Sequence, residues 1–129
     1  MFERAREWWR RWREGVRRRL VAESEVVVTA DDGEVTARYP DGEIQRVGWN
    51  DVARVSIETD GIGPWGADVW WVLEGEGERC TYPQGATGEH EAMGVYDQKL
   101  PGFDWRAVRD ASMSFSKARF VCWEKHQAD

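Results

Sequence analysis

Residues 68–73 spell Asp68-Val69-Trp70-Trp71-Val72-Leu73, a run of five apolar side chains after one aspartate. Such a continuous apolar run is typical of a central strand that is covered on both faces. A turn-forming stretch, Glu74-Gly75-Glu76-Gly77, follows it, and residues 78–82 predict a returning strand that Pro83 ends. The centre of the predicted fold is therefore a strand joined to its neighbour by a hairpin-like turn.

The chain before this hairpin alternates apolar and polar residues with a period of two, as half-buried strands do. The turn stretches Asp32-Gly33 and Pro40-Asp41-Gly42 interrupt the pattern, so the first strands form an antiparallel meander. A loop rich in glycine, residues 60–67, leads into the central strand. The predicted strands cover residues 25–29, 34–39, 43–47 and 53–59.

After the hairpin, the apolar residues take the spacing of helices. Residues 86–100 predict one helix, with Thr87 as its N-cap and Pro101-Gly102 as its stop. A second helix begins after its N-cap, Asp104, and residues 118–123 return to a strand. We therefore expect an α+β fold, in which an antiparallel sheet of six to seven strands packs against two C-terminal helices, with an added N-terminal amphipathic helix.

The N-terminal helix is predicted over residues 2–20, where apolar side chains recur every three or four positions. The first 20 residues hold eight Arg and three Glu, a formal charge of +5. We therefore separate residues 1–22, an Arg/Trp-rich helix, from residues 23–129, a single α+β domain. The residues of the helix that we expect to contact a membrane or a partner are Trp8, Trp9, Trp12, Arg10, Arg11 and Arg13.

Three roles for this helix remain open. In the first case, its tryptophan face docks on the sheet of the same chain, with the arginines facing the acidic body. Alternatively, the helix lies on an anionic membrane surface, as basic amphipathic helices do. In the third case it docks in a groove on a partner or on a second copy of the chain.

The rest of the chain is strongly acidic. Residues 21–129 hold ten Lys or Arg and 21 Asp or Glu, a formal charge of −11. Such a body repels phosphates, which argues against nucleic acid as a partner. A complementary field would instead speed association with a basic protein. No run of about 18 apolar residues, as a membrane-spanning helix needs, occurs in the sequence.

The sequence offers little for catalysis or cofactor binding. His90 and His126 are its two histidines, and His90 is expected on a charged helix surface. Cys80 and Cys122 lie in predicted strands without the close spacing of a zinc or redox motif. We expect two buried thiols, with a disulfide only if their strands are neighbours. We therefore expect no enzyme activity, no metal and no cofactor.

The candidate residues for contact with a partner lie in and after the glycine-rich loop. Trp65 is expected to be exposed at the tip of this loop. Exposed tryptophans on rigid loops often dominate binding energy, so Trp65 is a candidate contact residue. Carboxylates flank it in the loop and follow in the hairpin turn. The predicted partner-binding residues are Asp60, Trp65, Asp68, Glu74, Glu76 and Glu78.

Four stretches in this order resemble a family of small, uncharacterised bacterial proteins. They are Trp49-Asn50-Asp51-Val52, Ile57-Glu58-Thr59-Asp60-Gly61-Ile62-Gly63-Pro64, Asp68-Val69-Trp70-Trp71-Val72-Leu73 and Leu100-Pro101-Gly102-Phe103-Asp104. The resemblance implies a cytoplasmic α+β domain of bacterial origin. In size, acidity and architecture the chain is also similar to the immunity proteins that accompany secreted toxins.

These observations favour a non-catalytic protein-binding module, most concretely an immunity-type inhibitor of a basic toxin, as a monomer or a homodimer in the cytoplasm. The alternative is a peripheral membrane domain at the inner membrane, anchored by residues 2–20. An enzyme is the third choice.

Overall fold

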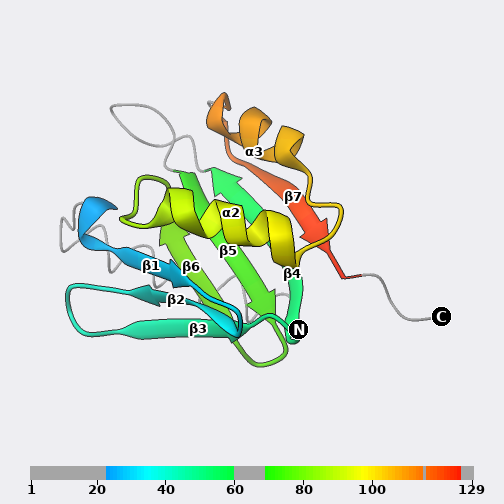
Figure 1. Cartoon of the computed structure of the whole chain (residues 1–129). Coiled ribbons are helices and arrows are strands. Elements are labelled where there is room, and N and C mark those ends of the chain that lie inside the picture. The colour runs from blue at the N-terminus through cyan, green and yellow to red at the C-terminus, as the bar shows by residue number, and fades with distance from the viewer. Residues whose placement is uncertain (1–22, 60–68, 115, 126–129) are drawn as a thin grey trace.

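Within residues 23–59, 69–114 and 116–125, which the computed structural model describes, seven strands form two antiparallel sheets (Figure 1). Two α-helices lie between the sixth and seventh strands along the chain, and a short 3-10 helix, η1, precedes the first strand. The elements are η1 (Glu23–Glu25), β1 (Val27–Ala30), β2 (Glu34–Arg38), β3 (Ile44–Gly48), β4 (Val52–Thr59), β5 (Val69–Gly75), β6 (Arg79–Pro83), α2 (Glu89–Lys99), α3 (Trp105–Ser112) and β7 (Ala118–Glu124). The α+β class is therefore confirmed.

The predicted single sheet of six to seven strands is wrong, because the meander forms a sheet of its own. Its order is β1-β2-β3, and the second sheet has the order β6-β5-β4-β7. The chain turns sharply between β3 and β4, where the Asp51 amide donates to the Gly48 carbonyl (2.9 Å). The two strands thus enter different sheets.

Side chains from the region of the first sheet form hydrogen bonds with backbone groups on the free edge of β6, where a further strand would otherwise pair. The Thr81 amide donates to Gln45 Oε1 at 2.8 Å, and the Thr81 hydroxyl donates to the same atom at 3.0 Å. The Tyr39 hydroxyl, from the residue that follows β2, donates to the Thr81 carbonyl on the same edge. These bonds occupy the backbone groups of Thr81 that would otherwise be open to another strand.

The prediction that β5 is a central strand is confirmed. It lies between β4 and β6, and its residues Trp70, Trp71, Val72 and Leu73 are all buried. Because side chains alternate along a strand, Trp71 and Leu73 face the helices and the first sheet, whereas Trp70 and Val72 face the other way. We call the face that carries Ser56, Trp70 and Val72 the outer face.

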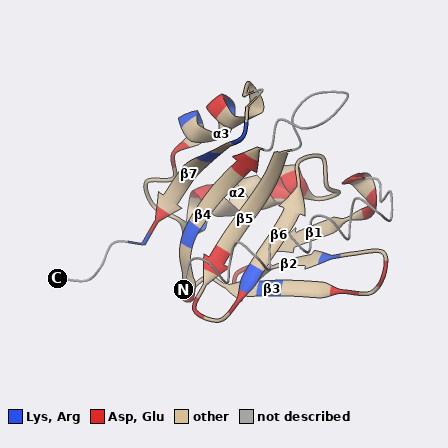
Figure 2. Cartoon of the chain, turned by 180° about the vertical axis from the view of Figure 1, so that it is seen from behind, with Lys and Arg blue, Asp and Glu red and all other residues tan. Residues whose placement is uncertain are grey.

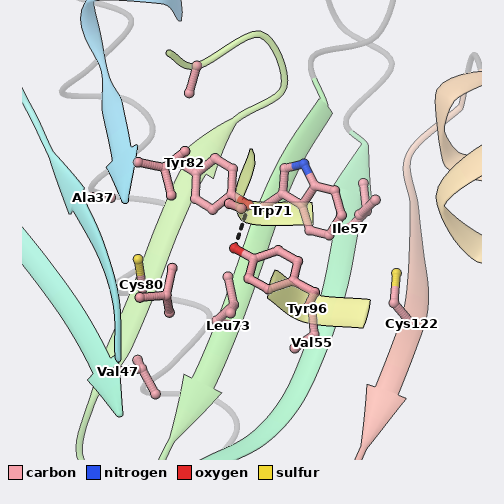
Figure 3. Packing of buried hydrophobic residues seen from close by; sticks show 14 of the residues in the cluster. Ala37, Val47, Val55, Ile57, Trp71, Leu73, Cys80, Tyr82, Tyr96 and Cys122 are labelled. Carbon is pink, nitrogen blue, oxygen red and sulfur yellow. Dashed lines mark hydrogen bonds between the residues drawn. The ribbon is translucent and has the colours of Figure 1, made fainter. Parts of the chain in front are cut away.

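One core lies between the second sheet, the first sheet and α2 (Figure 3). Val47 and Ala37 reach it from the first sheet, and both are fully buried. Trp71 stacks on Tyr82, with ring centroids 5.9 Å apart, and Tyr96 of α2 packs against it. The core therefore joins both sheets and the helix into one unit.

Of the two predicted helix N-caps, one is confirmed and the other is wrong. Asp104 caps α3, because its side chain accepts from the amides of Arg106 and Ala107. Thr87 does not cap α2, since its hydroxyl donates to the Ser24 carbonyl at 2.7 Å. The N-cap is Gly88, whose φ of 90° is left-handed and whose missing Cβ would collide with the Val28 carbonyl. Helix α2 therefore begins at Glu89, three residues later than predicted.

The predicted helix over residues 2–20 and the predicted division of the chain after residue 22 involve residues outside the described part of the chain. Both remain predictions.

Candidate functional site

Three turns that are far apart in the sequence meet at one end of the molecule. The Trp49 amide, in the β3–β4 turn, donates to the Gly33 carbonyl of the β1–β2 turn at 3.1 Å. The Trp49 indole nitrogen also donates to the Asp31 carbonyl, at 2.6 Å. The indole itself packs edge-on against Tyr96. These contacts hold the first two turns side by side and anchor them to the core.

The β5–β6 turn lies against the β3–β4 turn through Gly75. A Cβ on Gly75 would lie 2.7 Å from the Asp51 carbonyl oxygen, closer than such contacts allow. The Gly75 amide donates to the Glu78 carbonyl at 2.9 Å, which closes the hairpin. Gly77 supplies the positive φ, 71°, that the turn requires. Glycine at these positions therefore lets the third turn join the other two.

The three turns carry five exposed carboxylates, which we call the acidic turn cluster: Asp31, Asp32, Asp51, Glu76 and Glu78. Figure 2 shows acidic residues at the end of β5 and in the turn beyond it. Glu76 and Glu78 were predicted as binding residues, and the structure places them in this cluster. The other three were missed, because sequence reasoning treated each turn separately.

Glu74, predicted together with them, has a different environment. Its side chain is 17% exposed and accepts from Arg119 Nη2 of β7 at 2.7 Å. Arg119 reaches it across β4, on the outer face of the sheet. Glu74 is therefore engaged within the chain and does not belong to the acidic turn cluster.

Local hydrogen bonds keep Asp31 of the cluster ionised. The backbone amides of Glu34 and Gly33 donate to its carboxylate at 2.9 and 2.8 Å, and these bonds lower the pKa of Asp31. Lys99 lies 3.5 Å from Asp32, and the Lys125 ammonium donates to the Asn50 carbonyl. These two lysines offset part of the negative charge at this end.

The remaining predicted contact residues lie outside the described residues. They are Asp60, Trp65 and Asp68 in the loop, and Trp8, Trp9, Trp12, Arg10, Arg11 and Arg13 in the N-terminal segment. Their roles remain predictions.

A half-buried carboxylate that sequence reasoning missed lies at the start of α2. Glu89 accepts from the Trp71 indole nitrogen at 2.7 Å and from the Gly85 amide at 3.0 Å. The hydroxyls of Tyr82 and Tyr96 lie 2.6 Å apart in the core below it. A carboxylate in the first turn of a helix, next to an apolar strand rich in tryptophan, is the signal that could have indicated this contact.

The hydrogen bonds of Glu89 and of the two tyrosines join neighbouring elements of the fold, as structural contacts do. Burial raises the pKa of Tyr82 and of Tyr96 well above the ordinary value, so both hydroxyls stay protonated. His90, beside Glu89, is exposed on α2. Within the described part of the chain, His, Cys, Asp and Glu side chains form no group that could hold a metal ion.

The two thiols lie on opposite edges of the second sheet, Cys80 on β6 and Cys122 on β7. Both are buried and free, as expected for strands that are not neighbours.

Neither a protein-family model, nor a curated protein, nor a solved structure matches this chain. The likeness to a bacterial family therefore remains a prediction that the four quoted stretches carry. No described helix is both long and apolar enough to cross a membrane.

Proposed function

We propose that this chain is a protein-binding module whose acidic turn cluster holds a basic partner. One observation carries the proposal: three turns distant in sequence bring Asp31, Asp32, Asp51, Glu76 and Glu78 to one end of the molecule, all exposed. Like charges that gather at one end of a molecule repel one another, and a basic partner would relieve that repulsion.

The surface suits rapid and selective association. Opposite fields steer two proteins together, and carboxylates held on short turns lose little entropy when they are bound. The turns are fixed by backbone hydrogen bonds and by the contact of Gly75 with Asp51. The cluster is therefore ordered before any partner arrives.

In its most concrete form, the module is an immunity-type inhibitor that covers a basic toxin in the bacterial cytoplasm. The proposal takes the chain as a monomer or a homodimer without catalytic activity of its own. The analogy with immunity proteins in size and acidity supports this form. The acidic body makes nucleic acid an unfavourable partner.

Charge reversal tests the proposal. The full chain is used as bait in a lysate of its native host, and the retained proteins are identified by mass spectrometry. We expect one basic protein in stoichiometric amount. Its association rate should fall by about tenfold or more with Glu76→Lys/Glu78→Lys, and the dependence on salt should weaken, because electrostatic steering is lost.

The matched control is Glu91→Lys/Asp110→Lys, which changes the net charge equally at two exposed helix positions. It should leave most of the association rate intact, since these residues lie outside the cluster. Equal effects of the two double variants, or a bait that retains no basic protein, would exclude the acidic turn cluster as the binding surface.

A further inference from the structure

The outer face of the second sheet carries a buried apolar patch. Figure 2 shows this face, with α2 behind the sheet. Trp70 is 6% exposed and Val72 is 3% exposed, although both side chains lie on the face of β5 opposite Trp71, which packs against Tyr96 of α2. Ser56, opposite Val72 on β4, is fully buried.

Two described contacts border this patch. Arg119 reaches across β4 to Glu74 at 2.7 Å. Thr81, in register with Val72, bonds to Gln45 of the first sheet at 3.0 Å. Trp70 and Val72 are not members of the core cluster, which includes Trp71 and Leu73 of the same strand. The Ser56 hydroxyl has no hydrogen-bond partner among the described residues. Neither contact involves Trp70, and a tryptophan on an open sheet face would be largely exposed, so the burial of Trp70 calls for further cover.

We propose that the outer face is the docking surface of residues 2–20 of the same chain. The apolar stripe of this segment, which contains Phe2, Trp9, Trp12 and Val16, supplies the side chains that a patch around Trp70 needs. Its arginines would then lie over a body of opposite charge.

The point where the segment joins the body agrees with this placement. Residue 22 precedes η1, and Ser24 of η1 is held by the Thr87 hydroxyl at 2.7 Å. The Thr87 amide donates to the Val26 carbonyl at 2.9 Å, just beyond the end of β6. The segment therefore leaves the body at the edge of the second sheet.

The segment is also long enough. A helix of 19 residues spans about 28 Å. Four strands at a spacing of about 4.8 Å are narrower than this, so the helix could cross the whole sheet. The loop of residues 60–68 is adjacent to Trp70, the second residue of β5, whereas Val72 lies two residues farther along the strand.

Apolar contact, more than charge, would hold the segment in place. Around the patch, Arg54 pairs with Glu124 at 2.9 Å and Arg119 pairs with Glu74 at 2.7 Å. These pairs already balance much of the charge on the face. Docking would keep the tryptophans of the segment away from membranes, while the acidic turn cluster stays accessible.

Hydrogen exchange of the indole groups in the full chain tests this proposal, because Trp70 and Trp71 lie on opposite faces of one strand. In Trp9→Glu/Trp12→Glu we expect exchange at the Trp70 indole to rise by about tenfold or more. The Trp71 indole, bonded to Glu89 on the inner face, should keep its protection. The control Arg10→Gln/Arg17→Gln alters the other faces of the segment and should leave Trp70 protected.

Unchanged protection of Trp70 in Trp9→Glu/Trp12→Glu would overturn the proposal. Protection that is lost when the wild-type chain is diluted would overturn it as well, because a second copy would then supply the cover.

A second measurement does not depend on how well that variant folds. A nitroxide on Gly15→Cys should broaden the Trp70 indole signal more than that of Trp105, which lies on α3. A label that leaves the Trp70 signal intact would exclude docking on this face. Vesicles of anionic phospholipid should leave the Trp70 signal unchanged, and release of the segment onto them would favour the membrane alternative.

Discussion

At the scale of single residues, the least expected feature is a polar pair inside an aromatic core. The hydroxyls of Tyr82 and Tyr96 are 2.6 Å apart, and both side chains are fully buried (Figure 3). Each hydroxyl satisfies the other, so neither pays the cost of an unpaired buried group. The pair links β6 directly to α2.

Removing both hydroxyls should therefore cost less than the sum of the costs of removing each one alone. We expect Tyr82→Phe to lower the free energy of unfolding by about 1–3 kcal/mol, because the Tyr96 hydroxyl loses its partner. The double variant Tyr82→Phe/Tyr96→Phe should lose less than the sum of the single losses. Urea unfolding of the four proteins measures this, and strictly additive losses would show that the hydroxyls are not coupled.

A second prediction at the scale of residues concerns the two thiols, whose reactivity depends on pH. Burial raises the pKa of Cys122 to about 12 and the pKa of Cys80 higher still, whereas an unfolded cysteine has a pKa near 8.5. The thiolate is the reactive form, so at pH 8 a disulfide reagent should modify the native chain far more slowly than the chain in urea. Both thiols lie on edge strands, but the pKa of Cys122 is raised less, so Cys122 should react before Cys80.

The same pKa shifts determine how the stability of the folded chain changes with pH. The folded chain holds these protons more tightly, so stability should fall as the pH rises above about 8.5. Mass spectrometry of the labelled chain identifies the order of reaction. Rapid labelling of Cys80 under native conditions would contradict its burial.

At the scale of elements, the two α-helices begin by different means. The Asp104 side chain accepts two backbone amides of α3, at 3.0 and 3.3 Å. In contrast, the N-cap of α2 is Gly88, which has no side chain to accept a hydrogen bond. Asp104 is local in the sequence and could be predicted, whereas Gly88 is required by the approach of Val28 from another element.

Asp104→Ala should accordingly lower the free energy of unfolding by about 1 kcal/mol, the usual cost of losing an N-cap. The control Asp110→Ala, at an exposed position of the same helix, should change it by less than about 0.5 kcal/mol. Thermal unfolding of both variants beside the wild type makes the comparison. A loss that is equal in the two variants would mean that the cap bonds add nothing to stability.

At the scale of the whole molecule, two sheets share one core. Val35 and Val47 from the first sheet and Leu73 and Ile57 from the second belong to the same cluster. The bonds from Gln45 and Tyr39 to Thr81 join the sheets as well. Separate unfolding of either sheet would expose the apolar face of the other.

We therefore expect a single cooperative unfolding transition in urea, with equal midpoints for tryptophan fluorescence and far-ultraviolet circular dichroism. Val47→Ala, at a fully buried position of β3, should shift both midpoints together and cost about 2 kcal/mol. The control Ile44→Ala, at a 45% exposed position of the same strand, should cost less than about 0.5 kcal/mol. Midpoints that separate would indicate that the first sheet unfolds alone.

Packing across the whole molecule also explains where the predicted binding residues lie. Glu74, Glu76 and Glu78 are neighbours in the sequence, yet β5 turns Glu74 toward Arg119 and the hairpin leaves the other two exposed. Asp31 and Asp51 joined them through contacts between turns, such as that of Gly75 with Asp51. Which acids share a surface was therefore decided by packing between distant segments.

By itself, the sequence determined the elements: the strands, the buried character of residues 70–73, the stop after α2 and the cap at Asp104. These depend on side-chain alternation and on bonds between residues a few positions apart, which a local pattern records. The tertiary structure alone decided that the meander forms a separate sheet, that Gly88 is the N-cap of α2 and that five carboxylates meet at one end. Each of these depends on contacts between segments far apart in the chain, such as Gln45 with Thr81, and no local pattern specifies which distant surfaces will pack together.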